Sequence, residues 1–151
     1  LCNHDFTLIA EYFGIKKSNQ TLDPILSSPN AKMLIDWLRS QKFLHVDYQL
    51  GYCMAHAGIS PEFDLGMALS YAQRIEEKLG GDDAEVWLRK ILKSGVDRFN
   101  REASLIDIDR YLVSAFTRMR YCYGDHRLDF GTAAADQVAW HIRRCFAGFG
   151  E

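Results

Sequence analysis

Residues 52–61, Tyr-Cys-Met-Ala-His-Ala-Gly-Ile-Ser-Pro, constrain the fold more than any other stretch of this chain. Four strand-compatible residues precede His56, while Gly58 and Pro61 follow it, so the pattern predicts a short strand that ends in a loop. A second strand is predicted over residues 43–48, and a turn near Gly51 favours a hairpin between the two. The chain is therefore expected to present a histidine at the end of an antiparallel pair.

Two helices are predicted before this hairpin. Asp5 is expected to cap the first, and Gly14 is a plausible stop. Its apolar face is predicted to comprise Phe6, Ile9, Ala10 and Phe13. Residues 16–30 are predicted to form a loop around a short apolar turn at 22–26, and Asn30 is expected to cap the second helix. The buried stripe of that helix is predicted to be Met33, Leu34, Trp37 and Leu38.

Helical periodicity also dominates the part after Pro61. Helices are predicted over residues 65–79, around Trp87 and over 108–120, followed by a small hairpin of residues 121–123 and 127–130. Residues 131–151 show no clear period and form an unassigned tail. The expected fold class is therefore α/β, with helices outnumbering strands.

Composition narrows the classes of partner. The 151 residues are 48% apolar and 25% charged, which fits one globular domain with its own core. A net charge of −2 argues against a broad nucleic-acid or anionic-membrane surface, and no apolar run is long enough to span a bilayer. The four cysteines form no C-x-x-C pair, which favours reduced thiols and a cytoplasmic protein.

Asn3-His4-Asp5 is the first candidate for chemistry. An asparagine oxygen suits hard divalent ions such as manganese, and an adjacent histidine can transfer a proton without binding the metal. The alternative is that Asn3 and Asp5 merely cap a helix and that His4 is exposed, which the tripeptide alone favours.

His56 is the second candidate, because imidazole is the commonest metal ligand and Gly58 leaves room for close approach. Alone, His56 is slightly better explained as a histidine bonded to a backbone carbonyl. The two motifs together favour a metal site, since such a site draws ligands from separate strand ends.

Arg118 and Arg120 are candidates for binding phosphate oxygens, because guanidinium groups pair with phosphate in a bidentate way. Their place at a predicted helix end also suits a purely structural role, since the helix dipole favours cations there. The remaining histidines, His45, His126 and His141, lack such a context and are interpreted as surface or strand residues.

Three of these motifs resemble a known family. Residues 1–5, Leu-Cys-Asn-His-Asp, and residues 54–61, Met-Ala-His-Ala-Gly-Ile-Ser-Pro, resemble two motifs of the calcineurin-like metallophosphoesterases. Residues 115–122, Ala-Phe-Thr-Arg-Met-Arg-Tyr-Cys, resemble the signature of one branch, the symmetrical bis(5′-nucleosyl)-tetraphosphatases. The resemblance covers residues 1–130, which are expected to form a partial metallophosphoesterase domain, with β-sandwich strands flanked by helices.

The resemblance implies a hydrolase that splits diadenosine tetraphosphate, a dinucleoside polyphosphate, into two ADP. Two divalent ions, manganese or cobalt, would activate a bridging hydroxide. Asn3 and His56 would be metal ligands, and His4 would protonate the leaving oxygen. Arg118, and less surely Arg120, would hold polyphosphate oxygens.

The chain also departs from the family. The early Gly-Asp motifs of the family, Gly-Asp-x-His-Gly and a Gly-Asp followed by Arg-Gly, supply acidic and histidine ligands and are missing here. The late Gly-His-Trp/Thr motif is also missing, and Cys2 replaces a glycine. We therefore expect an internal fragment that is inactive alone and prone to self-association through exposed core residues. The alternatives are a non-catalytic remnant or interaction module, or another phosphoesterase such as a serine/threonine protein phosphatase.

Overall fold

The computed structural model describes residues 1–17, 20–93 and 95–131, and these form an α/β fold that is mostly helical. The elements in order are α1 (Asn3–Tyr12), α2 (Asp23–Leu26), α3 (Ala31–Arg39), β1 (Leu44–Asp47), β2 (Tyr52–Ala55), α4 (Leu65–Gly80), α5 (Ala84–Ile91), α6 (Leu105–Thr117), β3 (Tyr121–Cys122) and β4 (Leu128–Asp129). The predicted predominance of helices is confirmed. Residues 132–151 lie outside the described residues, and with them most of the predicted tail and His141.

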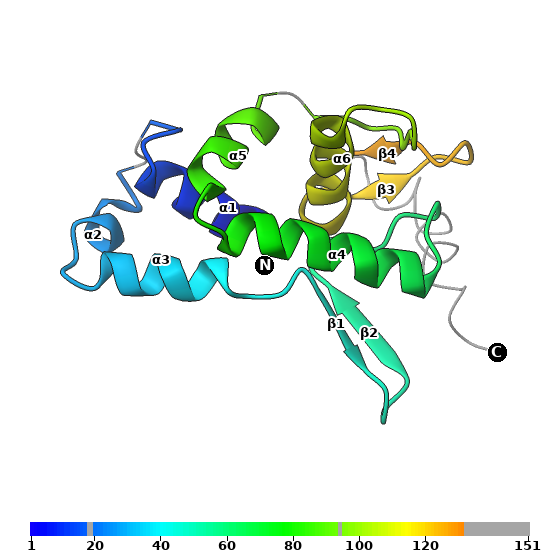
Figure 1. Ribbon diagram of the computed structural model, residues 1–151, viewed down its shortest axis with the longest axis horizontal. Helices are drawn as coiled ribbons and strands as arrows, with labels where there is room; N and C mark the ends of the chain where they lie inside the picture. The colour runs from blue at the N-terminus through cyan, green and yellow to red at the C-terminus, as the bar shows by residue number, and fades with distance from the viewer. Residues whose placement is uncertain (18–19, 94, 132–151) are drawn as a thin grey trace.

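Helix α4 is the centre of the helical body, where it contacts α3, α5, α6 and β1 (Figure 1). Its buried residues Ala68, Ala72, Ile75 and Leu79 recur every three or four positions, so one face of the helix enters the core. The Asp64 carboxylate accepts a hydrogen bond from the Met67 amide at 2.7 Å, which satisfies a free donor at the start of the helix. No helix among the described residues is long and apolar enough to cross a bilayer.

Three phenylalanines connect the elements that carry the motifs. The ring centroids of Phe6 and Phe43 lie 5.5 Å apart, and those of Phe43 and Phe116 lie 6.4 Å apart. Phe6 belongs to α1, Phe43 leads into β1 and Phe116 lies in the last turn of α6. All three are buried, so the hydrophobic core fixes the start of the chain, the first hairpin and the end of α6 relative to one another.

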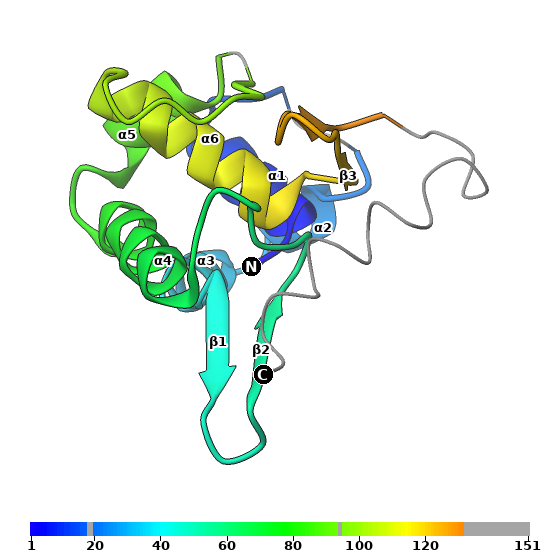
Figure 2. The ribbon, with the colours of Figure 1, turned by 90° about the vertical axis from the view of Figure 1, so that its right-hand side faces the viewer.

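Strands β1 and β2 form the predicted hairpin, which projects from the helical body in both ribbon views (Figures 1 and 2). The strands are antiparallel, with Leu44 opposite Ala55 and Asp47 opposite Tyr52. The turn includes Gly51 at a φ of 68°, a conformation that favours glycine. Strands β3 and β4 form the second predicted hairpin, so the described residues contain two separate two-stranded sheets.

One of the two expected N-caps is different in the structure, and the other is at the predicted position. Helix α1 begins at Asn3 with Cys2 as its N-cap, while Asp5 lies inside the first turn and accepts a hydrogen bond from the Cys2 amide at 2.7 Å. Asp5 therefore stabilises the helix start from within rather than preceding it. Asn30 does precede α3, but its side chain makes no capping hydrogen bond with the described residues.

The predicted buried stripe of α3 was wrong at two of its four positions. Met33 and Trp37 are 67% and 57% exposed, whereas Leu38 is buried and Leu34 partly buried. The residues that enter the core are Ala31, Ile35 and Leu38. The apolar surface of α3 is wider than the face it buries against α1 and α4, so the sequence pattern could not select the correct side.

Helix α6 also lies three residues earlier than predicted. Ser104 begins it by accepting a hydrogen bond from the Asp107 amide, and the helix ends at Thr117, where the Arg118 and Met119 amides both donate to the Ser114 carbonyl oxygen. Arg118, Met119 and Arg120 therefore follow the helix instead of completing it. Met119 is nevertheless buried.

Candidate metal and phosphate site

The Asn-His-Asp motif forms the first turn of α1. Asn3 and His4 are the first two residues of the helix, and both are exposed. The amino group of Leu1 donates a hydrogen bond to the Lys42 carbonyl oxygen at 2.7 Å, two residues before β1 begins. The motif is thus fastened next to the base of the first hairpin.

His56 lies at the same base of the hairpin. Its predecessor Ala55 ends β2 and pairs with Leu44, the first residue of β1, and His56 itself is exposed. Figures 1 and 2 both show the N-terminus near the end of the hairpin where β1 begins and β2 ends. The fold therefore brings the two motif-bearing segments to one end of the hairpin, and direct clustering of the Asn3, His4 and His56 side chains stays a prediction.

The loop behind His56 is held against α6 by a backbone and a side-chain contact. The Ala57 amide donates to the Phe116 carbonyl oxygen at 2.9 Å, and the hydroxyl groups of Ser60 and Tyr111 lie 2.6 Å apart in the core. The His-Ala-Gly-Ile-Ser-Pro motif and the Phe-Thr-Arg-Met-Arg motif are therefore packed directly together, although more than fifty residues separate them in the sequence.

Gly58 is where these two motifs approach most closely. A side chain at position 58 would place its Cβ 2.6 Å from the Met119 methyl carbon, closer than real Cβ contacts. The glycine thus lets the loop lie flat on the buried Met119 side chain. The sequence interpretation left room at Gly58 for close approach of a ligand or of backbone, and the structure shows the Met119 side chain in the space beside it.

Arg118 and Asn3 line one pocket, of about 220 Å³. Arg118 is exposed, and its guanidinium carbon lies 5.5 Å from the centre of the Phe130 ring, an arrangement that holds the charged group by a cation–π contact. Arg120 is also exposed, but its backbone amide is bonded to the Asp129 carbonyl oxygen at 2.8 Å and it is not among the described residues that line this pocket. Of the two arginines, Arg118 is the better placed for a ligand shared with Asn3.

The second hairpin supports Phe130 and hence Arg118. The Asp129 carboxylate accepts hydrogen bonds from the Tyr123 hydroxyl at 2.6 Å and the Gly131 amide at 2.7 Å. These hydrogen bonds hold the pKa of Asp129 below its usual value, because they stabilise the ionised carboxylate. The bond from Tyr123 has the largest effect. The hydrogen bonds bracket Phe130, so they fix the segment on which Arg118 rests.

Metal-binding capacity is limited in the described part of the chain. It contains no group of three or more histidine, cysteine, aspartate or glutamate side chains that could hold a metal ion. Asn3 and His56 are neutral donors, and two neutral donors do not offset the repulsion between two dications. The described residues therefore do not make a two-metal site by themselves.

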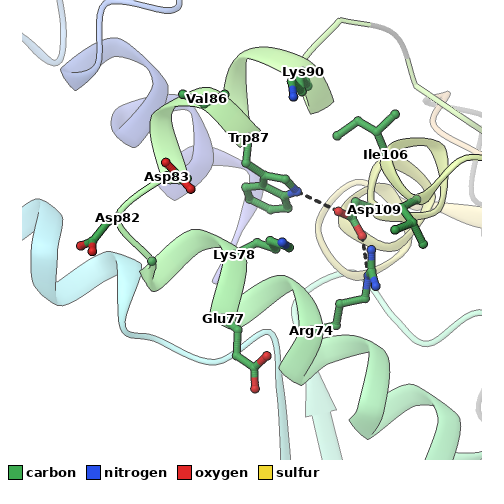
Figure 3. Close-up of a pocket in the computed structure, with 12 residues that line it drawn as sticks. Arg74, Glu77, Lys78, Asp82, Asp83, Val86, Trp87, Lys90, Ile106 and Asp109 are labelled. Carbon is green, nitrogen blue, oxygen red and sulfur yellow. Dashed lines mark hydrogen bonds and ion pairs between the residues drawn. The ribbon is translucent and has the colours of Figure 1, made fainter.

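A different pocket, of about 500 Å³, opens between α4, α5 and α6 and contains none of the predicted site residues (Figure 3). At its wall the buried Asp109 carboxylate accepts hydrogen bonds from Arg74 at 2.7 Å and from the Trp87 indole at 2.9 Å. The sequence analysis missed this group. The signal was an aspartate whose neighbours three positions away in the helix, Ile106 and Leu112, are apolar. Its structural effect is to join three helices through one carboxylate.

Comparison with known proteins places these motifs in context. No family model matches the chain. A symmetrical bis(5′-nucleosyl)-tetraphosphatase of Buchnera aphidicola subsp. Schizaphis graminum is 41% identical over 131 residues, covering 85% of this chain and 48% of the relative. The protein of the same name from Histophilus somni (strain 2336) is 39% identical over 141 residues, covering 92% and 52%. That of Cellvibrio japonicus is 40% identical over 134 residues, covering 87% and 50%.

The identity extends well beyond the three short motifs, since it covers 85% or more of this chain in each of these comparisons. The chain spans about half the length of the curated relatives it matches. Over most of its own length, this chain is therefore homologous to about half of a symmetrical bis(5′-nucleosyl)-tetraphosphatase.

Proposed function

We propose that this chain carries part of the site of a symmetrical tetraphosphatase, a hydrolase that splits diadenosine tetraphosphate into two ADP. The main support is the identity of about 40% to proteins of that name across most of the chain. A second support is geometric, because the loop after His56 and the segment ending at Arg118 pack on each other, and Arg118 lines one pocket with Asn3.

In this proposal Asn3 and His56 bind divalent metal ions, manganese or cobalt, and His4 protonates the leaving oxygen. Arg118 holds polyphosphate oxygens, with Arg120 in a secondary role. The position of Asn3 at the first turn of α1 supports the substrate part of this assignment, since the partial positive charge of the helix N-terminus attracts an anionic phosphate group. When bound, a pair of metal ions supplies a hydroxide near neutral pH and neutralises charge in the transition state.

Acidic metal ligands are the missing component. Neither the Gly-Asp-x-His-Gly motif nor the Gly-Asp motif followed by Arg-Gly, which supply them in the family, occurs in this sequence. We therefore propose that this chain alone does not turn over diadenosine tetraphosphate, and that activity requires those ligands from a further segment.

The proposal extends to the fold of residues 1–130, which we assign to a partial calcineurin-like domain whose β1–β2 hairpin belongs to a larger sheet. Tyr48, Leu50, Tyr52 and Met54 of the hairpin are each at least 67% exposed, an apolar surface of the kind that associates. A cytoplasmic protein that self-associates through this hairpin is proposed, and sedimentation velocity at several protein concentrations tests the association.

The test of function is complementation. A segment of a curated relative that carries the Gly-Asp motifs is fused to this chain, loaded with manganese or cobalt, and assayed for ADP release from diadenosine tetraphosphate. Turnover is expected in the fusion, with loss in His4→Ala and a lower rate in Arg118→Ala at unchanged metal content. His45→Ala, an exposed β1 histidine, is the matched control and should retain activity.

Two outcomes contradict the proposal. A fusion that folds and binds metal but releases no ADP would favour the rival assignment, a non-catalytic remnant or interaction module. Equal activity in the His4→Ala fusion would remove His4 from proton transfer. The observation that favours the rival is that the two early Gly-Asp motifs of the family are missing from this sequence.

A further inference from the structure

The pocket shared by Asn3 and Arg118 has an unusual charge composition. Four basic residues line it, Lys16, Lys93, Arg110 and Arg118, and the described lining contains no aspartate or glutamate. The pocket of about 500 Å³ has a different balance, with three basic and four acidic residues in its lining. In a chain whose net charge is −2, the smaller pocket is thus a local concentration of positive charge. We call these four residues and the space they line the basic pocket.

We propose that the basic pocket binds a diphosphate group without the help of a metal ion. Its cations come from four separate segments: the loop after α1, the segment after α5, the middle of α6 and the residue after α6. Cations on different segments can surround an anion, whereas a run on one helix face is normally solvated. The inference rests on the proposed function, which assigns Arg118 to polyphosphate binding. It adds Lys16, Lys93 and Arg110 as further phosphate-binding residues.

The four cations have different freedom to meet a ligand. Arg110 is the fixed one, because it is bonded to the Asp107 carboxylate and donates twice to the Lys90 carbonyl oxygen, at 3.2 and 2.8 Å. Lys16 and Lys93 are exposed, and the Lys16 ammonium lies 3.5 Å from the Thr7 hydroxyl. Arg118 is positioned over Phe130, which leaves the edge of its guanidinium for an anion. Two exposed lysines and an oriented arginine therefore line the pocket together with Arg110, which is held in place by the Asp107 carboxylate.

Size and charge together select phosphate groups over larger anions. A pocket of about 220 Å³ admits a compact group and excludes a nucleic-acid duplex. Because several cations act on one ligand, a diphosphate with more negative charge should bind more tightly than monophosphate. A free pyrophosphate and the diphosphate of ADP share this chemistry, so the experiment includes both.

The experiment is calorimetric titration of the whole chain in the presence of a chelator. Pyrophosphate, ADP, inorganic phosphate and adenosine are the probes. Pyrophosphate and ADP are expected to bind, phosphate more weakly and adenosine not at all, and binding should weaken with salt. Lys93→Gln and Arg118→Gln are each expected to weaken pyrophosphate binding about tenfold, which corresponds to about 1.4 kcal/mol.

Lys17→Gln is the matched control. Lys17 is adjacent to Lys16 and exposed but does not line the basic pocket, so its loss removes the same charge from the surface and should leave affinity unchanged. The mutated side chains are exposed, and circular dichroism verifies that each variant is folded. Tighter binding of ADP than of pyrophosphate would show that a nucleotide, rather than a free diphosphate, is the preferred source.

Three results would overturn the inference: no pyrophosphate binding, equal weakening in Lys17→Gln, or adenosine binding as tight as that of ADP. Because the titration contains no metal and measures no turnover, its failure is separate from failure of the proposed hydrolase. A fusion that binds pyrophosphate but has no activity would contradict only the proposed hydrolase function. An active fusion that does not bind pyrophosphate would contradict only the proposed role of the basic pocket.

Discussion

The Ser60 and Tyr111 hydroxyl groups lie 2.6 Å apart in the buried core and join the loop after His56 to the middle of α6. Ser60 and Tyr111 are 1% and 0% exposed, so water cannot replace either partner. The Ser60 oxygen also lies 3.2 Å from the Glu62 amide, which donates to it. This small network determines how the loop of one motif rests on the helix that carries the other.

Replacing Tyr111 with phenylalanine removes one partner and leaves the ring in place. We expect Tyr111→Phe to lower the free energy of unfolding by about 1 kcal/mol, the usual net value of an intramolecular hydrogen bond. Tyr48→Phe is the control, because Tyr48 is 78% exposed. Urea unfolding measures both, and equal losses would mean that the hydroxyl pair does not contribute to stability.

The contact between Gly58 and Met119 leads to a second prediction. Gly58→Ala is expected to cost roughly 1–3 kcal/mol of stability, because the new methyl group overpacks a filled space. Met119→Ala alone should cost about 2–5 kcal/mol through a cavity, but the double variant should cost less than the sum. Gly124→Ala is the control, since nothing lies within 4 Å of its added Cβ. Strict additivity in urea unfolding would be evidence against the contact.

The Asp109 carboxylate provides a third prediction. Arg74→Met removes a 2.7 Å hydrogen bond and an ion pair from a carboxylate whose side chain is 3% exposed. Arg74 itself is 31% exposed, so solvent weakens the pair, and we expect a loss of about 2 kcal/mol, typical of a hydrogen bond to a charged group. Lys78→Met, at an exposed lysine of the same pocket, should change the urea midpoint little. An equal effect of both variants would assign no structural role to the pair.

Asp107 gives a pH-dependent prediction. Hydrogen bonds from the Ser104 hydroxyl and then from Arg110 hold the pKa of Asp107 below its usual value, because they favour the ionised carboxylate. The pKa of Asp107 is lower in the folded chain than in the unfolded chain. The stabilisation that its ionised carboxylate gives to the fold is therefore complete above the unfolded-state pKa of about 3.9, and it is lost as pH falls through the folded-state pKa.

We therefore expect Asp107→Asn to lower the urea midpoint at neutral pH and to match the parent chain at strongly acidic pH. The difference should shrink below about pH 5, the upper limit of this titration window. Asp82→Asn, which removes an exposed carboxylate, controls for net charge. A difference between parent and Asp107→Asn that stays constant with pH would contradict the linkage.

The two hairpins could be predicted from sequence because their signals are local. Period-two apolar residues surround turns that contain Gly51 or Gly124, and the register follows from the short connections. The face of α3 could not be predicted, because Met33 and Trp37 continue its apolar pattern and only packing against α1 and α4 decides which side is buried.

The candidate site was predictable to the extent that its motifs are contiguous in sequence. Asn3, His56 and Arg118 each belong to a recognisable run of residues, and the structure adds that Asn3 and Arg118 line the same pocket. The basic pocket was not predictable, because Lys16, Lys93 and Arg110 are unremarkable lysines and arginines in separate segments. Only the folding of α1, α5 and α6 against one another brings them together.

The last prediction concerns metal ions. Asn3 and His56 are neutral ligands, so any manganese ion that this chain retains should bind weakly and singly. With a dissociation constant near 1 mM, 1 mM manganese would stabilise the fold by only about 0.4 kcal/mol. The electron paramagnetic resonance signal of free manganese falls as ions bind, so its decrease counts the bound ions. It is expected to show at most one, removed by His56→Ala and retained in His45→Ala, where the exposed histidine belongs to the same hairpin. Two tightly bound ions would mean that this sequence supplies anionic ligands other than the aspartates of the Gly-Asp motifs, and the chain could then be active without a complementing segment.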